Sequence, residues 1–281
     1  MGFGCNAAGV TGCRIIDSPR EKLIAILTNS FVPCNGRFPT LIAILSMFFA
    51  PAAAGALGAA VPALLLTLVI VLGVLVTLLV SKLLSATVLR GAPSSFTLEL
   101  PPYRRPQVGK VLVRSLIDRT LFVLGRAAAV AAPAGLLIYL LANLHTRAGD
   151  TLLLYCTRFL DPFGRALGLD GVILFAFVLG FPANEIVIPI ILMSYLGTGT
   201  LEGFSSLADL KRLLVANGWT WVTAACTMLF SLMHWPCSTT CLTIREETGS
   251  LGWTLLAAAL PTALGMLACF LLASAARLLG V

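Results

Sequence analysis

Apolar residues in this chain come in long unbroken runs, unlike the alternating patterns of soluble domains. Residues 38–81 contain no Asp, Glu, Lys or Arg. That is enough chain for two crossings, because a helix needs roughly 20 apolar residues to span a bilayer. A Gly/Pro-rich piece at 51–62 is the natural interruption. The pattern therefore predicts membrane-spanning helices at about 38–55 and 59–81.

Four further runs are predicted to span the membrane on the same grounds. One of them carries a single charge, Glu185, and the next carries no charge and one histidine, His234. We expect residues 151–160 to form an amphipathic helix on the far membrane surface and the first 13 residues to form half a helix. The four runs cover residues 120–144, 171–196, 213–244 and 248–276.

The composition excludes an ordinary soluble enzyme, a disordered chain and a coiled coil. Of 281 residues, 58% are hydrophobic and 11% charged, and the mean hydropathy is +0.98, whereas soluble domains average about 25% charged residues. The net charge of +7 comes from basic residues between apolar runs, which favours anchoring at a lipid surface over nucleic-acid binding. Residues 82–119 hold seven basic and two acidic side chains, so we expect this loop in the cytoplasm. A count of loop charges sends segments 1–13 and 171–196 the same way.

Two places in the chain repeat. Residues 2–6 (GFGCN) match residues 180–184 (GFPAN) at Gly, Phe and Asn, and a Pro-Cys pair follows each, at 33–34 and 236–237. Gly and Pro interrupt helices, and interrupted segments in corresponding halves are typical of a transporter's central binding site. The alternative is a packing kink at a helix crossing.

Glu185 is the sharpest single candidate. A carboxylate at mid-membrane costs ~2.5–3.5 kcal/mol on insertion scales, so it is expected to face a cavity, an ion or a partner. A simpler interpretation, compatible with the first, is that Pro182 breaks the helix and Glu185 sits at the positive end of the restarted half-helix.

Cysteine, histidine and amide side chains supply the remaining candidates. Cys237 and Cys241 are four residues apart and share one helix face, with His234 one turn earlier; these ligands suit Fe(II), Zn and Cu. The alternative is that the cysteines are small hydrophobes and His234 a core histidine. The full candidate metal set is Cys5, Cys34, Asn184, Glu185, His234, Cys237 and Cys241.

Motifs for nucleotide binding and for hydrolytic catalysis are missing from the sequence. Gly109-Lys110 is followed by Val111 and has no glycine five residues earlier, so it does not fit a P-loop. The chain has no Rossmann fingerprint, no Gly-x-Ser-x-Gly and no His-Glu-x-x-His. We therefore expect neither a nucleotide site nor an enzyme in this chain.

Several segments together resemble the FeoB family of bacterial ferrous-iron transporters. The resemblance runs in family order across nearly the whole chain, and the matching segments read GFGCN at 2–6, LTN at 27–29, PCNGRFP at 33–39, ELPPYR at 99–104, ANEIV at 183–187, HWPCSTT at 234–240 and ETGS at 247–250.

The resemblance implies an all-α, polytopic inner-membrane protein with two gate-like repeats that contain broken or re-entrant helices. Fe(II) would be the transported ion, and proposed gate cysteines map onto Cys5, Cys34 and Cys237, with Glu185 in the second gate. The implied division is a first gate-like module at 1–81, N-terminally incomplete, a basic cytoplasmic linker at 82–119, a connecting span and surface helix at 120–169, and a second module at 170–281.

The family's GTP-binding domain has no counterpart in this sequence. Energy coupling would come from a separate GTP-binding subunit, and a homo-oligomer is also possible. Two alternatives stay open: a transporter of another divalent metal or of a nucleoside-like solute, and a non-transporting membrane subunit that scaffolds a partner.

Overall fold

The protein is described here from a computed structural model, which covers residues 2–50, 56–91, 107–114, 122–145, 151–197 and 206–280. Within these ranges the chain forms helices and no strands, so the all-α prediction is confirmed. The ELPPYR segment at 99–104 lies outside the described residues.

The first half of the chain forms four α-helices around one interruption. Ser18 caps the second of them, because its hydroxyl accepts a hydrogen bond from the Glu21 amide at 3.4 Å and Pro19 occupies the first helical position. The helices are α1 (Asn6–Gly12), α2 (Pro19–Thr28), α3 (Phe38–Ile44), which continues as a π-helical turn (Leu45–Phe49), and α4 (Ala56–Ala86).

The second half begins with a short helix and a long one and then repeats the pattern of interruption. Its helices are α5 (Val108–Arg114), α6 (Phe122–Asn143), α7 (Leu152–Ala166), α8 (Gly171–Leu179), α9 (Val187–Leu196), α10 (Leu207–Ala216), α11 (Trp221–Met233), α12 (Ser238–Thr248) and α13 (Leu251–Leu278). A 3-10 turn, Asn184–Ile186, precedes α9.

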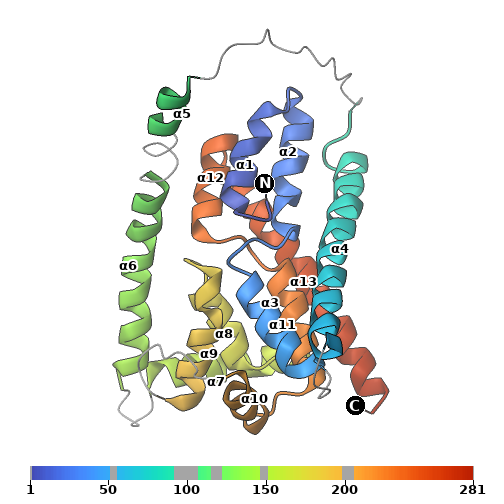
Figure 1. The fold of residues 1–281 in the computed structure, drawn as a ribbon, viewed down its shortest axis with the longest axis vertical. Helices are drawn as coiled ribbons and strands as arrows, with labels where there is room; N and C mark the ends of the chain where they lie inside the picture. Colours follow the sequence, from blue (N-terminus) through green and yellow to red (C-terminus); the bar gives the residue numbers. More distant parts are fainter. Residues whose placement is uncertain are drawn as a thin grey trace.

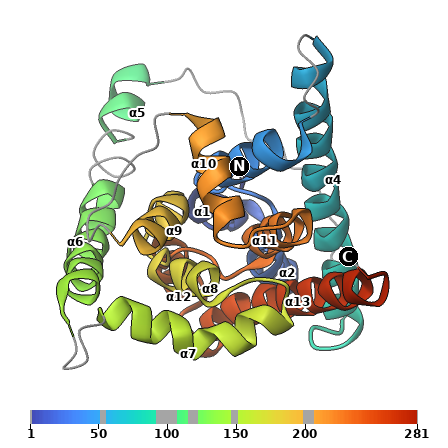
Figure 2. The ribbon, with the colours of Figure 1, turned by 90° about the horizontal axis from the view of Figure 1, so that it is seen from below.

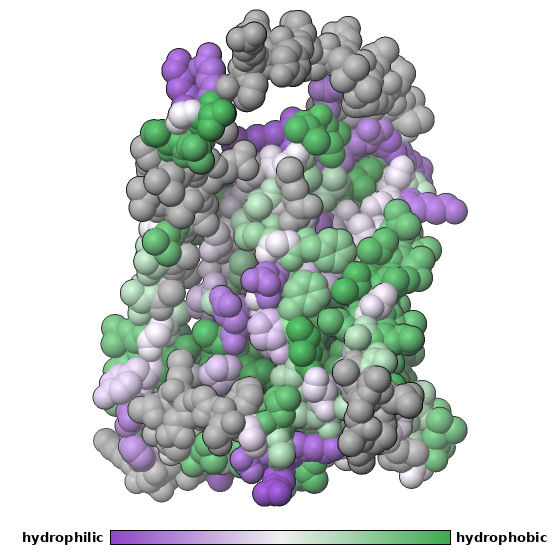
Figure 3. All heavy atoms as spheres, viewed as in Figure 1, coloured by the Kyte–Doolittle hydropathy of each residue, from purple (hydrophilic) through white to green (hydrophobic). Residues whose placement is uncertain are grey.

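Two of the described helices are long and apolar enough to cross a membrane, at Ala60–Ala86 and Leu251–Leu278, which confirms two predicted spans. Hydrophobic side chains cover the flank that α4 forms, and hydrophilic ones gather at the two ends of the molecule (Figure 3). These apolar surfaces imply contact with a lipid bilayer. Residues 151–160, predicted to form an amphipathic helix, belong to α7, which lies across the lower end of the bundle (Figures 1 and 2).

Three predicted spans are wrong in their form, one of them at residues 213–244, which are divided among α10, α11 and α12. Residues 171–196 do not make one crossing: α8 ends at Leu179, the chain turns back from Gly180, and α9 packs beside α8 (Figure 1). The turn is tight, since a Cβ on Gly180 would lie 2.6 Å from Val187 Cγ2. The expected span at 38–55 is instead a 12-residue helical segment, Phe38–Phe49, roughly 18 Å long and too short to cross.

Polar side chains hold the re-entrant pair α8–α9 at its lower end. Asp170 caps α8, with Oδ1 accepting from the Ile173 amide at 2.6 Å. The Tyr195 hydroxyl on α9 donates to the other Asp170 oxygen, and Trp219 Nε1, just before α11, donates to Tyr195 at 2.9 Å. This chain of hydrogen bonds ties α8, α9 and the start of α11 together.

The two repeats run in opposite directions. In Figure 1, α2 lies in the upper half and leads down through an interruption into α3, whereas α11 lies in the lower half and leads up into α12. Helices of different repeats pack together, α1 on α12 and α3 on α11. The count of loop charges predicted the same orientation for segments 1–13 and 171–196. The structure differs from this prediction, because α1 and α9 run from the centre of the molecule in opposite directions (Figure 1).

Each repeat has one close contact between a glycine of its long helix and the backbone of its broken helix. A Cβ added to Gly73 on α4 would lie 2.7 Å from the Phe31 carbonyl oxygen, and one added to Gly265 on α13 would lie 2.7 Å from the Met233 carbonyl oxygen. Each long helix therefore approaches the backbone at the end of its repeat's broken helix, where only glycine fits.

We expect Gly265→Ala to destabilise the protein by about 1–3 kcal/mol, because the new methyl group must displace backbone at Met233. Gly252→Ala, on the same helix, is the matched control, since its Cβ would meet only Ser250 Oγ at 3.6 Å. Thermal unfolding of the purified variants in detergent measures the difference. Equal melting temperatures for the two variants would contradict the close approach.

Candidate functional site

The interruption in the first repeat, which we call the first break, covers residues 32–37 between the end of α2 and α3. Its backbone is held locally, because the Arg37 amide donates to the Cys34 carbonyl at 2.9 Å. The Asn35 amide donates to the Gly4 carbonyl at 3.3 Å, so the Pro-Cys segment lies against the Gly-Phe segment of the same repeat.

The second repeat makes an equivalent contact. Its break covers residues 234–237 between α11 and α12, and its re-entrant turn covers residues 180–183. The Ser238 amide donates to the Phe181 carbonyl at 2.9 Å, and the Ser238 hydroxyl donates to the Pro182 carbonyl at 3.5 Å. The helix breaks predicted at the two Pro-Cys pairs and at residues 180–184 are thus present in the structure.

The breaks of the two repeats meet. A Cβ on Gly36 would lie 3.8 Å from Asn184 Cβ and 3.9 Å from the Glu185 amide nitrogen. The Asn184 side chain lies between two candidate ligands, with Nδ2 3.9 Å from Cys34 Sγ and Oδ1 3.2 Å from His234 Nε2. We call Cys34, Asn184 and His234 the central trio; all three side chains are buried.

The hydrogen bonds of His234 fix its tautomer. Nδ1 lies 3.1 Å from the Phe230 carbonyl oxygen and 2.8 Å from that of Ser231, so Nδ1 carries a proton. In a neutral imidazole Nε2 is then an acceptor. A 180° turn of the Asn184 amide, whose oxygen and nitrogen are nearly indistinguishable in position, would let its nitrogen donate to Nε2.

Arg37 stands beside the central trio and was missed in the sequence. Its side chain is fully buried, and its guanidinium donates to carbonyls of both repeats: Ser30 at 2.7 Å, Leu232 at 2.8 Å, His234 at 3.1 Å and Trp235 at 3.3 Å. The Leu232 carbonyl lies in the last turn of α11, where a helix leaves carbonyls without intrahelical partners, and those of His234 and Trp235 directly follow the helix. Arg37 therefore caps the second break and joins it to the first.

The remaining candidates lie around this centre at different depths. Cys237 and Cys241 are half-buried on α12, with Cys237 Sγ 3.2 Å from Thr240 Oγ1 and Cys241 Sγ 3.5 Å from the Pro236 carbonyl oxygen. Cys5 is exposed at the N-cap of α1, and Glu185 is exposed in the turn before α9. Across the part of the chain that the structure describes, no three His, Cys, Asp or Glu side chains converge as a metal cluster.

The electrostatics of the centre favour negative charge. Helices α1 and α12 begin there with Cys5 and Cys237 at their N-caps, and helix N-termini carry partial positive charge.

The fold and these breaks define a helical membrane protein with two inverted repeats whose interrupted helices meet at the centre. The chain is also similar to proteins of known family. A family model described as "Ferrous iron transport protein B C terminus" matches residues 66–118. No solved structure matches the chain.

Curated relatives extend the similarity across most of the chain. The "Fe(2+) transporter FeoB" of Staphylococcus aureus (strain COL) is 27% identical over 270 residues, covering 93% of this chain and 37% of the relative. The protein of the same name from Synechocystis sp. is 27% identical over 262 residues, covering 93% and 40%. That from Methanocaldococcus jannaschii is 27% identical over 263 residues, covering 89% and 36%.

These similarities confirm the resemblance to the FeoB family over most of the chain. The chain spans well under half of the length of these relatives.

Proposed function

We propose that this chain is the membrane part of a ferrous-iron permease. Fe(II) passes between a first gate-like module at 1–81 and a second at 170–281, and the linker at 82–119 and the segment at 120–169 connect them. The protein is multi-pass and lies in the cell inner membrane. The observation that carries the proposal is the meeting of the two breaks at Cys34, Asn184 and His234.

The chemistry of these side chains suits the cargo. Thiolate and imidazole are good ligands for Fe(II), and amide and carboxylate oxygens complete a divalent shell. Cys34, Asn184 and His234 would strip part of the water shell at the centre, while Cys237, Cys241, Glu185 and Cys5 would receive the ion on either side. A separate GTP-binding subunit supplies the energy coupling.

The test is anaerobic uptake of radioactive Fe(II) by cells that lack their own ferrous transport and express this chain, with and without a GTP-binding partner. We expect Fe(II) uptake when the partner is present. Mn(II) or Zn(II) at equal concentration should inhibit this uptake only weakly. Strong inhibition by those ions would assign another divalent metal, and uptake of a nucleoside unaffected by Fe(II) would contradict the metal altogether. A pure scaffold would bind its partner and transport nothing.

Two substitutions test the ligand assignment. We expect Cys237→Ser and Glu185→Gln each to lower the rate of Fe(II) uptake by roughly tenfold or more, the usual consequence of disturbing a metal site. Cys156→Ser on α7, away from the breaks, is the matched control with an uptake rate equal to wild type. Normal uptake in both Cys237→Ser and Glu185→Gln would show that the assignment is wrong.

A further inference from the structure

Helices α1 and α12 belong to different repeats and pack against each other on the upper side of the centre. Cys5 is at the N-cap of α1 and Cys237 at the N-cap of α12, and both helices rise from the centre toward the upper end of the molecule (Figure 1). We call their contact the α1–α12 seam. Because the seam is a boundary between the two repeats, the repeats can separate at this end only if the seam opens.

A buried carboxylate joins the two repeats at the upper end of the seam. Glu247 lies in the last turn of α12, and its side chain is 6% exposed. Its Oε1 accepts a hydrogen bond from Arg14 Nε at 2.6 Å, and its Oε2 accepts one from Lys22 Nζ at 3.4 Å. Arg14 follows α1 in a 3-10 turn, and Lys22 is on α2. Both cations therefore come from the first repeat, and we call these three side chains the Glu247 cluster.

The burial of Glu247 distinguishes this cluster from an ordinary surface ion pair. Exposed pairs contribute little because water competes for both partners, whereas a buried carboxylate that loses its partners is left uncompensated. The two cations are less buried than the carboxylate, since the side chains of Arg14 and Lys22 are 66% and 27% exposed. The cluster can therefore open by movement of the cations toward water, but only if another cation takes their place at Glu247.

The packing of the repeats does not by itself require a carboxylate at this place. Counting forward from Pro33 and Pro236, Glu247 on α12 corresponds to Ile44 on α3. Ile44 is fully buried in the main apolar core. One repeat therefore fills this position with an apolar side chain and the other with a charge, and a buried ionisable side chain in a membrane protein indicates a functional role.

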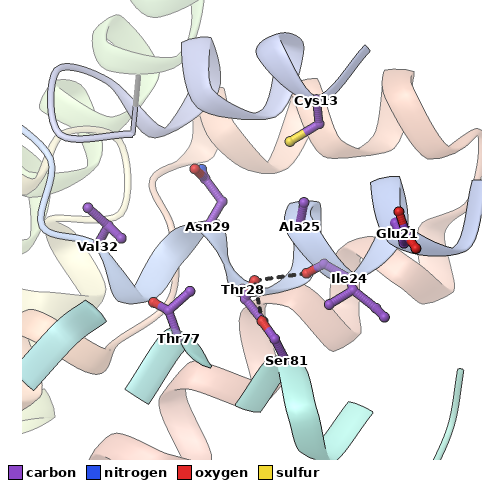
Figure 4. Close-up of a pocket in the computed structure, with 9 residues that line it drawn as sticks. All are labelled: Cys13, Glu21, Ile24, Ala25, Thr28, Asn29, Val32, Thr77 and Ser81. Carbon is purple, nitrogen blue, oxygen red and sulfur yellow. Dashed lines mark hydrogen bonds between the residues drawn. The ribbon is translucent and has the colours of Figure 1, made fainter. Parts of the chain in front are cut away.

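The first-repeat side of the Glu247 cluster borders an open cleft of about 400 Å³ between α1, α2 and α4 (Figure 4). Cys13 and Glu21 line this cleft, and they directly precede Arg14 and Lys22 in the chain. The segments that carry the two cations therefore have free space on one side. They can shift there without displacing tightly packed neighbours.

We propose that Glu247 is the gate residue at the upper end of the proposed permease: paired with Arg14 and Lys22 it holds the seam closed, and a divalent cation that takes its carboxylate opens the seam. The inference rests on the proposed function and adds its regulation. Carboxylate oxygens are ligands for divalent cations, but both oxygens of Glu247 are held by cations in this structure. The metal ion therefore binds by displacing them, and the link of Arg14 and Lys22 to α12 is then lost.

The reactivity of Lys22 tests this displacement without any substitution. The purified full-length chain is treated with an amine-acylating reagent, with and without Fe(II) under anaerobic conditions, and peptide mass spectrometry reads the rate at each lysine. We expect Fe(II) to raise the rate at Lys22 by roughly tenfold, the change that about 1.4 kcal/mol of lost pairing produces. Lys211, exposed on α10 at the lower end (Figure 1), is the internal control and should keep its rate.

Glu247→Gln tests whether the cluster holds the seam closed. A charged thiol reagent is added to inverted membrane vesicles, and the rate of modification is read at Cys237, which begins α12 at the inner end of the seam. We expect the rate to rise by roughly tenfold, with Fe(II) no longer affecting Lys22. Cys269, buried between α11 and α13, should stay unmodified. Asp17→Asn, which removes an exposed carboxylate near the start of α2, is the matched control and should behave as wild type.

Either of two results would overturn the gate: a rate at Lys22 that Fe(II) leaves unchanged in the wild-type chain, or equal rises at Cys237 and Cys269 in Glu247→Gln, which would mean that the whole bundle loosens. Neither measurement depends on transport. Wild-type Fe(II) uptake with unchanged rates at Lys22 and Cys237 would refute the gate alone. The expected rates in a chain that takes up no Fe(II) would refute the proposed permease and leave a contact between the repeats that a divalent cation opens.

Discussion

Replacing Arg37 with Leu is expected to cause the largest loss of stability of any single substitution near the breaks. The change removes donors from the carbonyls of Ser30, Leu232, His234 and Trp235 at once, and a buried carbonyl left without a donor costs about 1–3 kcal/mol, so we expect a total loss of several kcal/mol. For a chain of this size that corresponds to a fall of roughly 10 °C in melting temperature. Thermal unfolding of the purified chain measures it.

Two further variants make the Arg37 result specific. Arg37→Lys keeps the charge but loses the planar fork that reaches several carbonyls, so we expect a melting temperature between those of wild type and Arg37→Leu. Arg90→Leu removes an exposed arginine that bonds only within its own turn of chain, to the Ala86 carbonyl, and should change stability little. An Arg37→Leu protein as stable as Arg90→Leu would contradict the capping role.

The second large effect is expected on Fe(II) uptake from the central trio. Cys34→Ser and Asn184→Ala should each weaken the apparent affinity for Fe(II) by roughly 10–100-fold. The two side chains are in contact, with Asn184 Nδ2 3.9 Å from Cys34 Sγ, so their effects should not add, and the coupling should amount to about 0.5–3 kcal/mol. A double-mutant cycle on the concentration dependence of uptake measures it.

Asn35→Ala is the matched control for this cycle. Asn35 follows Cys34 directly, but its side chain is exposed, so we expect an apparent affinity for Fe(II) equal to wild type. Fully additive effects of Cys34→Ser and Asn184→Ala would mean that the two residues act at separate places. That outcome would contradict a shared site where the breaks meet.

The interruptions themselves could be predicted from the sequence because their cause is local. Pro182 and Pro236 lack a backbone N–H and disfavour a helical conformation in the residue before them, and the structure has breaks at both places. The long helices α4 and α13 were predictable for the same reason, since an uninterrupted apolar run longer than about 20 residues has few alternatives to a spanning helix.

Tertiary features could not be predicted in this way. The return of the chain at Gly180 depends on the packing of α9 against α8, which hydropathy does not encode, so residues 171–196 looked like one crossing. Arg37 directly precedes the uncharged run that starts at Phe38, and nothing in its local sequence marks it as a buried residue. Only the fold shows that three of the four carbonyls it binds come from residues about 195 positions further along the chain.

The most direct test of the meeting of the two breaks is X-ray absorption at the iron edge of the purified full-length chain loaded with Fe(II) under anaerobic conditions. We predict sulfur in the first shell of the iron together with nitrogen or oxygen, and loss of a sulfur contribution in Cys34→Ser but not in Cys156→Ser. An all-oxygen shell identical in wild type and Cys34→Ser would contradict the account.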